Sequence, residues 1–249
     1  MKLMEPINGV RWGVHLSFLS PDLAEFVGTL GFHWLFLDAQ RTPLDPKLCR
    51  DLVRAADVAN LFSVVRVAKV SAREIESYLD AGVLGIIAPN VSSAADARAL
   101  VAAVKFSPEG TRGAAFRSRS AGYGLTQSPA DYCAAANRAT FTAALIESKT
   151  GLDELESIAA VPGLNYLSIG ANDLALSLGI SAGAADARVR AILDETHSRI
   201  KALNKPQIAV VGDAEQARSA IAAGATLVAV SDAALLASSA RSLLQSMRA

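Results

Sequence analysis

The sequence predicts a single (β/α)8 barrel domain that spans residues 1–249. Three observations lead to this fold. Eight short apolar runs rich in β-branched residues alternate with segments of helical periodicity, which implies parallel strands joined by right-handed crossovers. The length of 249 residues is close to the ~250 typical of such a barrel. The glycine-rich fingerprint G-x-G-x-x-G of open dinucleotide-binding sheets is absent, which favours a closed barrel.

The predicted elements follow one another in a regular order. The eight strands are expected at residues 10–19, 33–38, 62–67, 85–89, 140–147, 166–170, 207–211 and 226–230. Capping residues are expected to open four of the helices between them, namely Ser20-Pro21, the capping box Ser71 to Glu74, Ser128-Pro129 and Asp213. Glycines that can adopt a left-handed conformation are expected to close helices at Gly31, Gly82 and Gly224.

Composition excludes several classes of partner. The chain has 24 basic and 24 acidic side chains, and this zero net charge argues against nucleic-acid binding, which needs a basic surface. No apolar run is long enough to cross a membrane and the N-terminus has no signal-peptide pattern, so we expect a cytoplasmic protein with no membrane contact. Cys49 and Cys133 lack metal-type spacing and are expected to be reduced thiols.

Acidic residues end two consecutive predicted strands. A barrel places functional groups at the C-terminal ends of its strands, and there the sequence has Glu147 after one apolar run and Asp173 after the next. A buried strand does not normally end on a carboxylate, and two carboxylate oxygens at one rim suit a hard divalent cation such as Mg²⁺. The alternative is two satisfied carboxylates that cap the following helices.

Other residues near the strand ends suggest an anion-binding site. Arg66 lies in the apolar strand F-S-V-V-R-V, where its planar guanidinium could bind a carboxylate or an enolate; the alternative is a structural ion pair with Asp38 or Asp80. The turn at residues 170–174 offers successive backbone N–H groups to an anion. The Gly-, Ser- and Arg-rich segment 108–127 is predicted to be a functional lid or binding loop; the alternative, for Arg117 and Arg119 individually, is a solvated surface loop.

Several short motifs follow one another along the chain. They are G-F-H-W-L-F-L-D (31–38), V-V-R (64–66), Y-L-D-A-G (78–82), P-x-G-x-R-G (108–113), I-E (146–147), G-x-x-D-L (170–174) and L-V-A-V-S-D (227–232). Taken together and in this order, they make the chain resemble the HpcH/HpaI aldolase family, the metal-dependent class II pyruvate aldolases. This family includes the 4-hydroxy-2-oxoheptanedioate and 2-keto-3-deoxy-sugar-acid aldolases. The resemblance implies a (β/α)8 barrel assembled as a homo-hexamer, a dimer of trimers with exchanged C-terminal helices.

The resemblance also implies roles for individual residues. Glu147 and Asp173 match the ligands of a divalent metal, Mg²⁺ or Mn²⁺ with Co²⁺ also expected to bind. Arg66 matches the arginine that stabilises the enolate. The amides of Ala171, Asn172 and Asp173 match the site for the pyruvate carboxylate. Such a metal would polarise the 2-oxo group as the bond between C3 and C4 breaks.

The chain departs from the family where strand two ends. The family pattern D-x-E-H, whose histidine acts in proton transfer with an aspartate that matches Asp80, is replaced here by Asp38-Ala39-Gln40-Arg41. Arginine stays protonated at ordinary pH and cannot act as a general base. The family's Q-x-E likewise becomes Leu145-Ile146-Glu147, without the glutamine.

Three explanations for the missing histidine remain open. His15, at the end of the first strand, could supply the imidazole. Arg41 with Gln40 could instead bind an anionic or phenolic acceptor while a metal-bound water moves the proton. Alternatively, the reaction could need no strong base, as in decarboxylation of a 2-oxo diacid such as oxaloacetate. His33 and His197 are expected to be structural.

The sequence therefore predicts a divalent-metal-dependent carbon–carbon lyase that cleaves a 4-hydroxy-2-oxo acid into pyruvate and an aldehyde. The alternatives are an oxaloacetate-type decarboxylase on the same site, a non-catalytic relative that binds a metal and an oxo acid, and a lyase that acts on coenzyme A thioesters.

Overall fold

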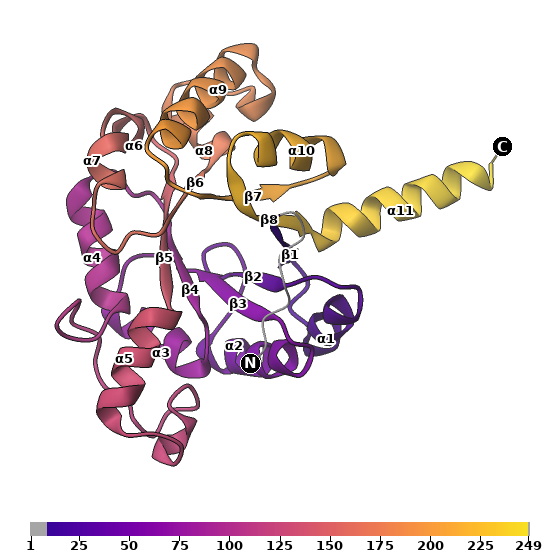
Figure 1. Cartoon of the computed structure of the whole chain (residues 1–249). Helices are drawn as coiled ribbons and strands as arrows, with labels where there is room; N and C mark the ends of the chain where they lie inside the picture. The colour runs from indigo at the N-terminus through magenta and orange to yellow at the C-terminus, as the bar shows by residue number, and fades with distance from the viewer. Residues whose placement is uncertain (1–8, 249) are drawn as a thin grey trace.

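Eight parallel strands close into a barrel in the order β1-β2-β3-β4-β5-β6-β7-β8 in the computed structural model, which describes residues 9–248 (Figure 1). The predicted fold and all eight predicted strands are confirmed. Their bounds are β1 Arg11–Leu16, β2 Trp34–Asp38, β3 Phe62–Arg66, β4 Gly85–Ala88, β5 Phe141–Ile146, β6 Tyr166–Ile169, β7 Gln207–Val211 and β8 Ala225–Ser231. The barrel closes through β1, which pairs with β2 on one side and with β8 on the other.

Helices follow the strands around the outside of the barrel, as parallel crossovers require. They are α1 Pro21–Thr29, α2 Pro46–Val58, α3 Ala72–Ala81, α4 Ala94–Val104, α5 Pro129–Ala139, α6 Lys149–Asp153, α7 Leu155–Ala159, α8 Ala171–Ser177, α9 Ala187–Ala202, α10 Ala214–Ala222 and α11 Asp232–Ser246, with short 3-10 turns at Gly122–Gly124 and Gly183–Ala185. None of the helices in the described part of the chain combines the length and the apolar character that a membrane crossing needs.

Aromatic rings fill the end of the barrel at which the strands begin. Trp34 stacks on Phe62 with ring centroids 6.1 Å apart, and Phe141 packs edge-on against both Phe62 and Tyr166. Each of these residues is the first of its strand. Gly13 on β1 leaves room for the Trp34 ring. Among residues 9–248, these rings therefore fill the barrel interior at the end where the strands begin.

Most of the predicted helix caps are confirmed. Ser20, Ser128 and Asp213 each accept a hydrogen bond from the first turn of the helix they open. The capping box at residues 71–74 is wrong, because the Ser71 side chain makes no capping bond and Glu74 Oε1 accepts from the backbone N–H of Ala68 instead. Gly31, Gly82 and Gly224 have positive φ values of 88°, 110° and 104°, as expected at closing positions.

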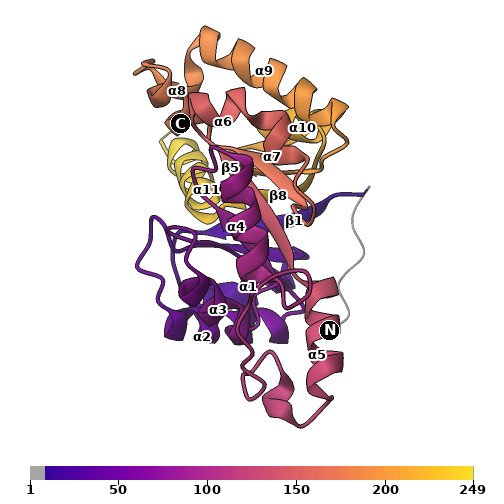
Figure 2. The ribbon, with the colours of Figure 1, turned by 90° about the vertical axis from the view of Figure 1, so that its left-hand side faces the viewer.

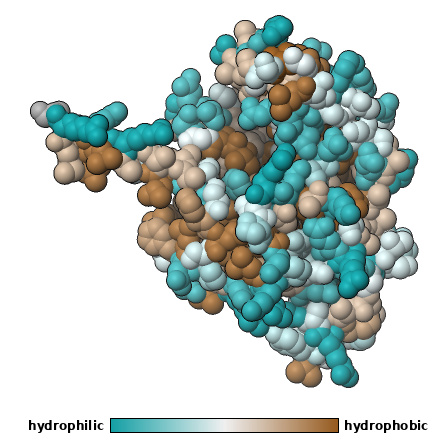
Figure 3. Space-filling model, turned by 180° about the vertical axis from the view of Figure 1, so that it is seen from behind, coloured by the Kyte–Doolittle hydropathy of each residue, from teal (hydrophilic) through white to brown (hydrophobic). Residues whose placement is uncertain are grey.

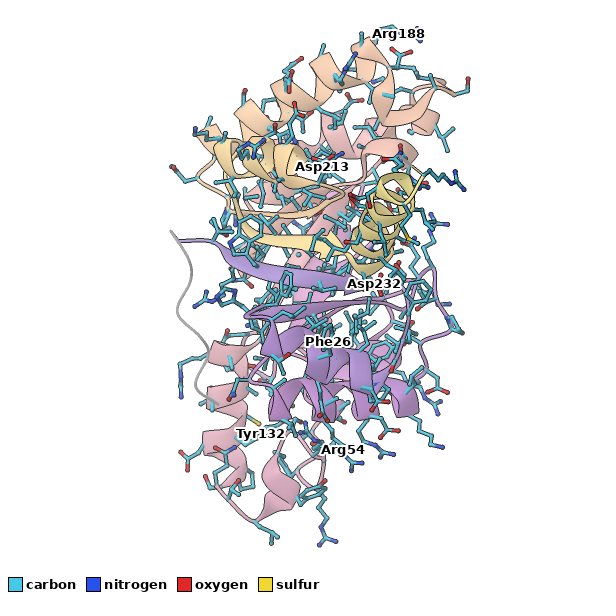
Figure 4. The ribbon with its side chains drawn as sticks, turned by 90° about the vertical axis from the view of Figure 1, so that its right-hand side faces the viewer. Phe26, Arg54, Tyr132, Arg188, Asp213 and Asp232 are labelled. Carbon is cyan, nitrogen blue, oxygen red and sulfur yellow. The ribbon has the colours of Figure 1, made fainter. Side chains whose placement is uncertain are left out.

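The first strand ends earlier than the predicted residue 19. The backbone N–H groups of Ser17 and Phe18 turn away from the sheet and donate to the carboxylate of Asp232, at distances of 2.9 to 3.0 Å. Asp232 is the first residue of α11 (Figure 4). A side chain from the far end of the sequence therefore sets the end of β1.

Segment 108–127 does not lie over the strand ends within this chain, so the prediction of a lid is wrong for a single chain. The backbone N–H of Ser120 donates to the carbonyl of Asp80, and Arg119 donates to the carbonyl of Ala81 and pairs with Asp57. These partners lie at the C-terminal ends of α3 and α2, where the strands begin. Figures 1 and 2 show α5, which follows this segment, and α6 at opposite ends of β5.

The C-terminal helix α11 points away from the barrel (Figure 1). Within this helix only its first residue, Asp232, is buried. One side of the projecting helix is apolar (Figure 3), and the exposed apolar side chains of the helix are Leu235, Leu236, Leu243 and Leu244. In a single chain, α11 therefore leaves an apolar surface uncovered.

Candidate active site

A cavity of about 190 Å³ opens among the C-terminal ends of the strands. Its polar lining comes from His15, Arg66, Ser168 and the backbone at Gly170, and its remaining wall is apolar. A larger cavity of about 420 Å³ lies within segment 108–127 and α5. We take the smaller cavity as the candidate site, because convergent polar groups at the strand ends of a barrel are the usual mark of chemistry.

The Arg66 guanidinium is held by the buried carboxylate of Asp38. Arg66 Nε donates to Asp38 Oδ1 at 3.0 Å and Nη2 donates to Oδ2 at 2.5 Å, which is the two-pronged geometry typical of strong arginine–carboxylate pairs. The Asp38 side chain is only 2% exposed. The structural ion pair considered for Arg66 therefore exists, with Asp38 rather than Asp80. Arg66 also lines the cavity, so the ion pair fixes the orientation of its guanidinium at the cavity wall.

His15 lies in the same cavity beside this pair. Its Nε2 atom is 3.9 Å from Asp38 Oδ2, and its ring packs against Phe36 with centroids 4.8 Å apart. Nε2 is buried without a hydrogen-bond partner among residues 9–248. Burial lowers the pKa of His15 from 6.5, and this outweighs the opposing effect of Asp38. The structure therefore brings a neutral imidazole with a free nitrogen next to Arg66.

Glu147 follows directly after β5 and is buried. It is not itself among the residues that line the cavity, but it packs against Gly170, which is. Its Oε1 accepts from the backbone N–H of Asn90 at 2.8 Å, while Oε2 is buried with no partner among residues 9–248. A Cβ atom at Gly170 would lie 2.6 Å from Oε2, so glycine lets the Glu147 side chain pack directly against this backbone. Burial raises the pKa of Glu147, and the charge of Asp173 raises it further. An unpartnered carboxylate oxygen near a second carboxylate suits a cation.

Asp173 lies in the first turn of α8, just after β6. Its Oδ2 is 3.5 Å from Arg41 Nη2, and both side chains are largely exposed. Gln40, beside Arg41, has a buried Oε1 without a partner within the described part of the chain. No described side chain caps α8, so its first N–H groups, from Ala171 onwards, lack a capping acceptor. The Asn172 side chain turns elsewhere and accepts from the N–H of Ala184.

Asp80 is not brought together with these residues in one chain. It lies on α3 and accepts from Arg112 Nη2 at 3.0 Å, and burial raises its pKa. Its predicted role in proton transfer stays a prediction. No group of three or more His, Cys, Asp or Glu side chains within residues 9–248 is placed to hold a metal. A cation at Glu147 and Asp173 would complete its shell with water and substrate, as Mg²⁺ commonly does.

The sequence profile of the HpcH/HpaI aldolase/citrate lyase family matches residues 11–238. The chain belongs to this family. It is therefore a carbon–carbon lyase by family, in agreement with the relatives it matches.

Two curated relatives and one solved structure illustrate the family. The chain is 33% identical to the hydroxypyruvate/pyruvate aldolase of Sagittula stellata over 88% of this chain and 85% of the relative. It is also 33% identical to the 2-dehydro-3,6-dideoxy-6-sulfogluconate aldolase of Pseudomonas putida, over 95% and 92%. A crystal structure of an HpcH/HpaI family protein from Burkholderia cenocepacia covers 96% of this chain, with 95% of its own length matched, at a TM-score of 0.89 and 30% identity.

Ser168 is the cavity residue that the sequence reasoning missed. It lies on β6, lines the cavity and donates to the carbonyl of Ile208 at 2.8 Å. Its strand begins with Tyr166, which points into the barrel among the aromatic rings. Because side chains on a strand alternate, a polar residue two positions later faces the same way. That alternation was the signal available in the sequence.

Proposed function

We propose that this member of the HpcH/HpaI family is a divalent-metal-dependent aldolase that reversibly cleaves a 4-hydroxy-2-oxo acid into pyruvate and an aldehyde. The observation that carries the proposal is the Oε2 atom of Glu147, which is buried without a hydrogen-bond partner among the described residues. Asp173 follows the neighbouring strand and is close enough to raise the pKa of Glu147. A divalent cation would give Oε2 the contact that it lacks and would offset the repulsion between the two carboxylates.

Glu147 and Asp173 would hold Mg²⁺ or Mn²⁺, and Co²⁺ suits the same oxygen ligands less specifically. When bound, the metal would act as a Lewis acid that polarises the 2-oxo group. The uncapped N–H groups of Ala171, Asn172 and Asp173 would donate to the substrate carboxylate. This charge arrangement suits an anionic oxo acid better than a neutral ketone.

Arg66 and His15 would carry out the remaining steps. Arg66, fixed by Asp38, would donate from its remaining N–H groups to the 2-oxo oxygen and stabilise the negative charge that develops there. The neutral Nε2 of His15 would accept the proton of the C4 hydroxyl. The C3–C4 bond then breaks, its electrons pass into the enolate, and C4 leaves as the aldehyde. A proton added at C3 completes pyruvate.

The assembly we propose is a hexamer built as a dimer of trimers, in which neighbouring chains exchange α11. The support is the apolar side of this helix, since Leu236 and Leu243 are each more than half exposed in one chain. Contiguous apolar surface of this kind usually marks a protein interface.

The deciding experiment compares two products. Pyruvate release from 4-hydroxy-2-oxo acids and CO₂ release from oxaloacetate are measured with Mn²⁺, with Mg²⁺ and with a chelator. We expect metal-dependent pyruvate release that Glu147→Gln abolishes, while Glu25→Gln, an exposed glutamate on α1, serves as the control. Release of CO₂ alone would make the protein a decarboxylase. Binding of Mn²⁺ and pyruvate without turnover or exchange of the pyruvate methyl protons with D₂O would make it a non-catalytic relative.

A further inference from the structure

Hydrogen bonds to Asp38 fix the backbone around Arg41, whereas the Arg41 side chain has few contacts. The N–H groups of Gln40 and Arg41 donate to Asp38 Oδ1 at 3.0 and 3.3 Å, and the N–H of Thr42 donates to the Asp38 carbonyl at 3.2 Å. These bonds fix the turn after β2. The Arg41 side chain, in contrast, is 59% exposed. Its guanidinium is therefore an exposed cation on a backbone turn that is fixed by hydrogen bonds.

The single side-chain partner of Arg41 among the described residues is Asp173. The distance from Nη2 to Oδ2 is 3.5 Å, the outer limit for a hydrogen bond. A guanidinium has five N–H donors, so most of its donors are free. Exposed pairs with this geometry contribute little stability. Little free energy is therefore needed to move Arg41 to a different carboxylate.

Arg66 is a second cation in the site. It differs from Arg41 in how many of its N–H groups are engaged and in how exposed its side chain is. Two of its N–H groups are engaged by Asp38, and its side chain is 18% exposed. Asp38 thus neutralises the inner cation. Among the described residues the outer cation hydrogen-bonds to Asp173, one of the two carboxylates proposed to hold the metal, and its charge also acts on Glu147, the other. The metal and Arg41 compete for the same oxygen atoms.

We propose that Arg41 exchanges partners and thereby selects the substrate: a divalent metal takes Asp173, and the released guanidinium binds a carboxylate at the far end of the acceptor half. This inference rests on the proposed function and deepens it, because it predicts a preference for oxo acids with a second, distal carboxylate. It also predicts coupling between two ligands. The metal frees Arg41 for the distal carboxylate, and by linkage that carboxylate favours metal binding.

Binding measurements test both halves of the proposal without turnover. The first is the affinity of the ligand-free protein for Mn²⁺, by titration calorimetry. Arg41→Gln removes the competing cation, so we expect Mn²⁺ to bind roughly three- to tenfold more tightly, the range for a partly exposed charge. Lys69→Gln is the matched control, since Lys69 is an exposed cation in the loop after the neighbouring strand β3. We expect no change in this control.

The second measurement compares 2-oxoadipate with 2-oxohexanoate in the Mn²⁺-loaded protein. These acids have equal chain lengths, lack the C4 hydroxyl needed for cleavage, and differ in the distal carboxylate. The wild type should bind 2-oxoadipate more tightly by roughly five- to tenfold, the effect expected for a charge-assisted pair discounted for exposure. The preference should disappear in Arg41→Gln, partly return in Arg41→Lys, and weaken with added salt.

The outcomes separate this inference from the proposed function. A wild type that binds both oxo acids equally, or an Arg41→Gln variant that keeps the preference or leaves Mn²⁺ affinity unchanged, overturns the role of Arg41 while metal-dependent aldol cleavage stands. A wild type that binds neither Mn²⁺ nor either acid overturns both. Two changes together support the exchange of partners: Arg41→Gln binds Mn²⁺ more tightly, and it loses the preference for 2-oxoadipate. Lys69→Gln should show neither change.

Discussion

A Cβ atom at Gly170 would lie 2.6 Å from the Oε2 atom of Glu147, the carboxylate oxygen that has no hydrogen-bond partner. The two residues follow neighbouring strands, because Ile146 of β5 is paired with Ile169 of β6. Gly170 has an ordinary φ of −90°, so its backbone does not require glycine. Glycine is needed here because any side chain would collide with the Glu147 carboxylate.

Gly170→Ala should weaken Mn²⁺ binding by at least about tenfold, because its methyl group would displace the carboxylate that we propose as a ligand. Titration calorimetry measures the effect. Gly212→Ala is the control, since a Cβ at this position, just after β7, would meet nothing closer than 3.5 Å. Equal Mn²⁺ affinity in wild type and Gly170→Ala would contradict a metal at Glu147.

Asp38→Asn should lower both stability and turnover. The substitution leaves the Arg66 guanidinium buried without a counter-charge, which typically costs about 3–5 kcal/mol. Denaturant unfolding measures the loss. Asp51→Asn is the control, because Asp51 forms an exposed pair with Arg54 at 3.5 Å, and its removal should cost less than about 1 kcal/mol. Similar losses in the two variants would mean that Asp38 does not anchor Arg66.

The pH dependence of cleavage should report His15. Burial lowers its pKa below 6.5, so the neutral base persists at pH 6.5 and is lost only as the pH falls further. The rate should therefore fall on the acid side, with a midpoint below 6.5, as the imidazole gains a proton. His15→Gln should remove this limb and slow cleavage by roughly 10²- to 10⁴-fold. An unchanged acid limb in the variant would assign it to a different group.

Gly13→Ala should destabilise the barrel, because its methyl group would overlap the indole of Trp34. Overpacking of this kind typically costs about 1–3 kcal/mol, which thermal or denaturant unfolding can measure. A second substitution, Trp34→Phe, vacates part of the indole volume. The double variant should thus lose less stability than the two single losses added together, and strict additivity would argue against the contact.

The barrel and much of the candidate site could be predicted from local patterns. Strand runs and helix caps repeat with clear periods, and the polarity of a barrel gathers residues from distant strands at one end. This is why His15, Arg66, Glu147 and Asp173 could be predicted as candidates before their positions were known. Their detailed contacts were not predictable, because the partners of Arg66 and of Asp173 depend on side-chain geometry across several strands.

The remaining errors come from contacts between distant parts of the sequence. The end of β1 depends on Asp232, which is 215 residues away from Ser17. The position of segment 108–127 depends on the carbonyl groups at the end of α3, such as that of Asp80. Neither interaction leaves a periodic signal in the sequence around it, so propensity and spacing alone predicted an extended strand and a lid.

The anchoring of α11 links the outside of the molecule to its centre. Asp232 begins this projecting helix and also binds the turn that follows His15, through Ser17 and Phe18. A displacement of the helix, such as one caused by docking onto another copy, would therefore shift the backbone two residues from the His15 imidazole. Association between subunits could in this way tune the reaction centre without a neighbouring molecule ever touching the substrate.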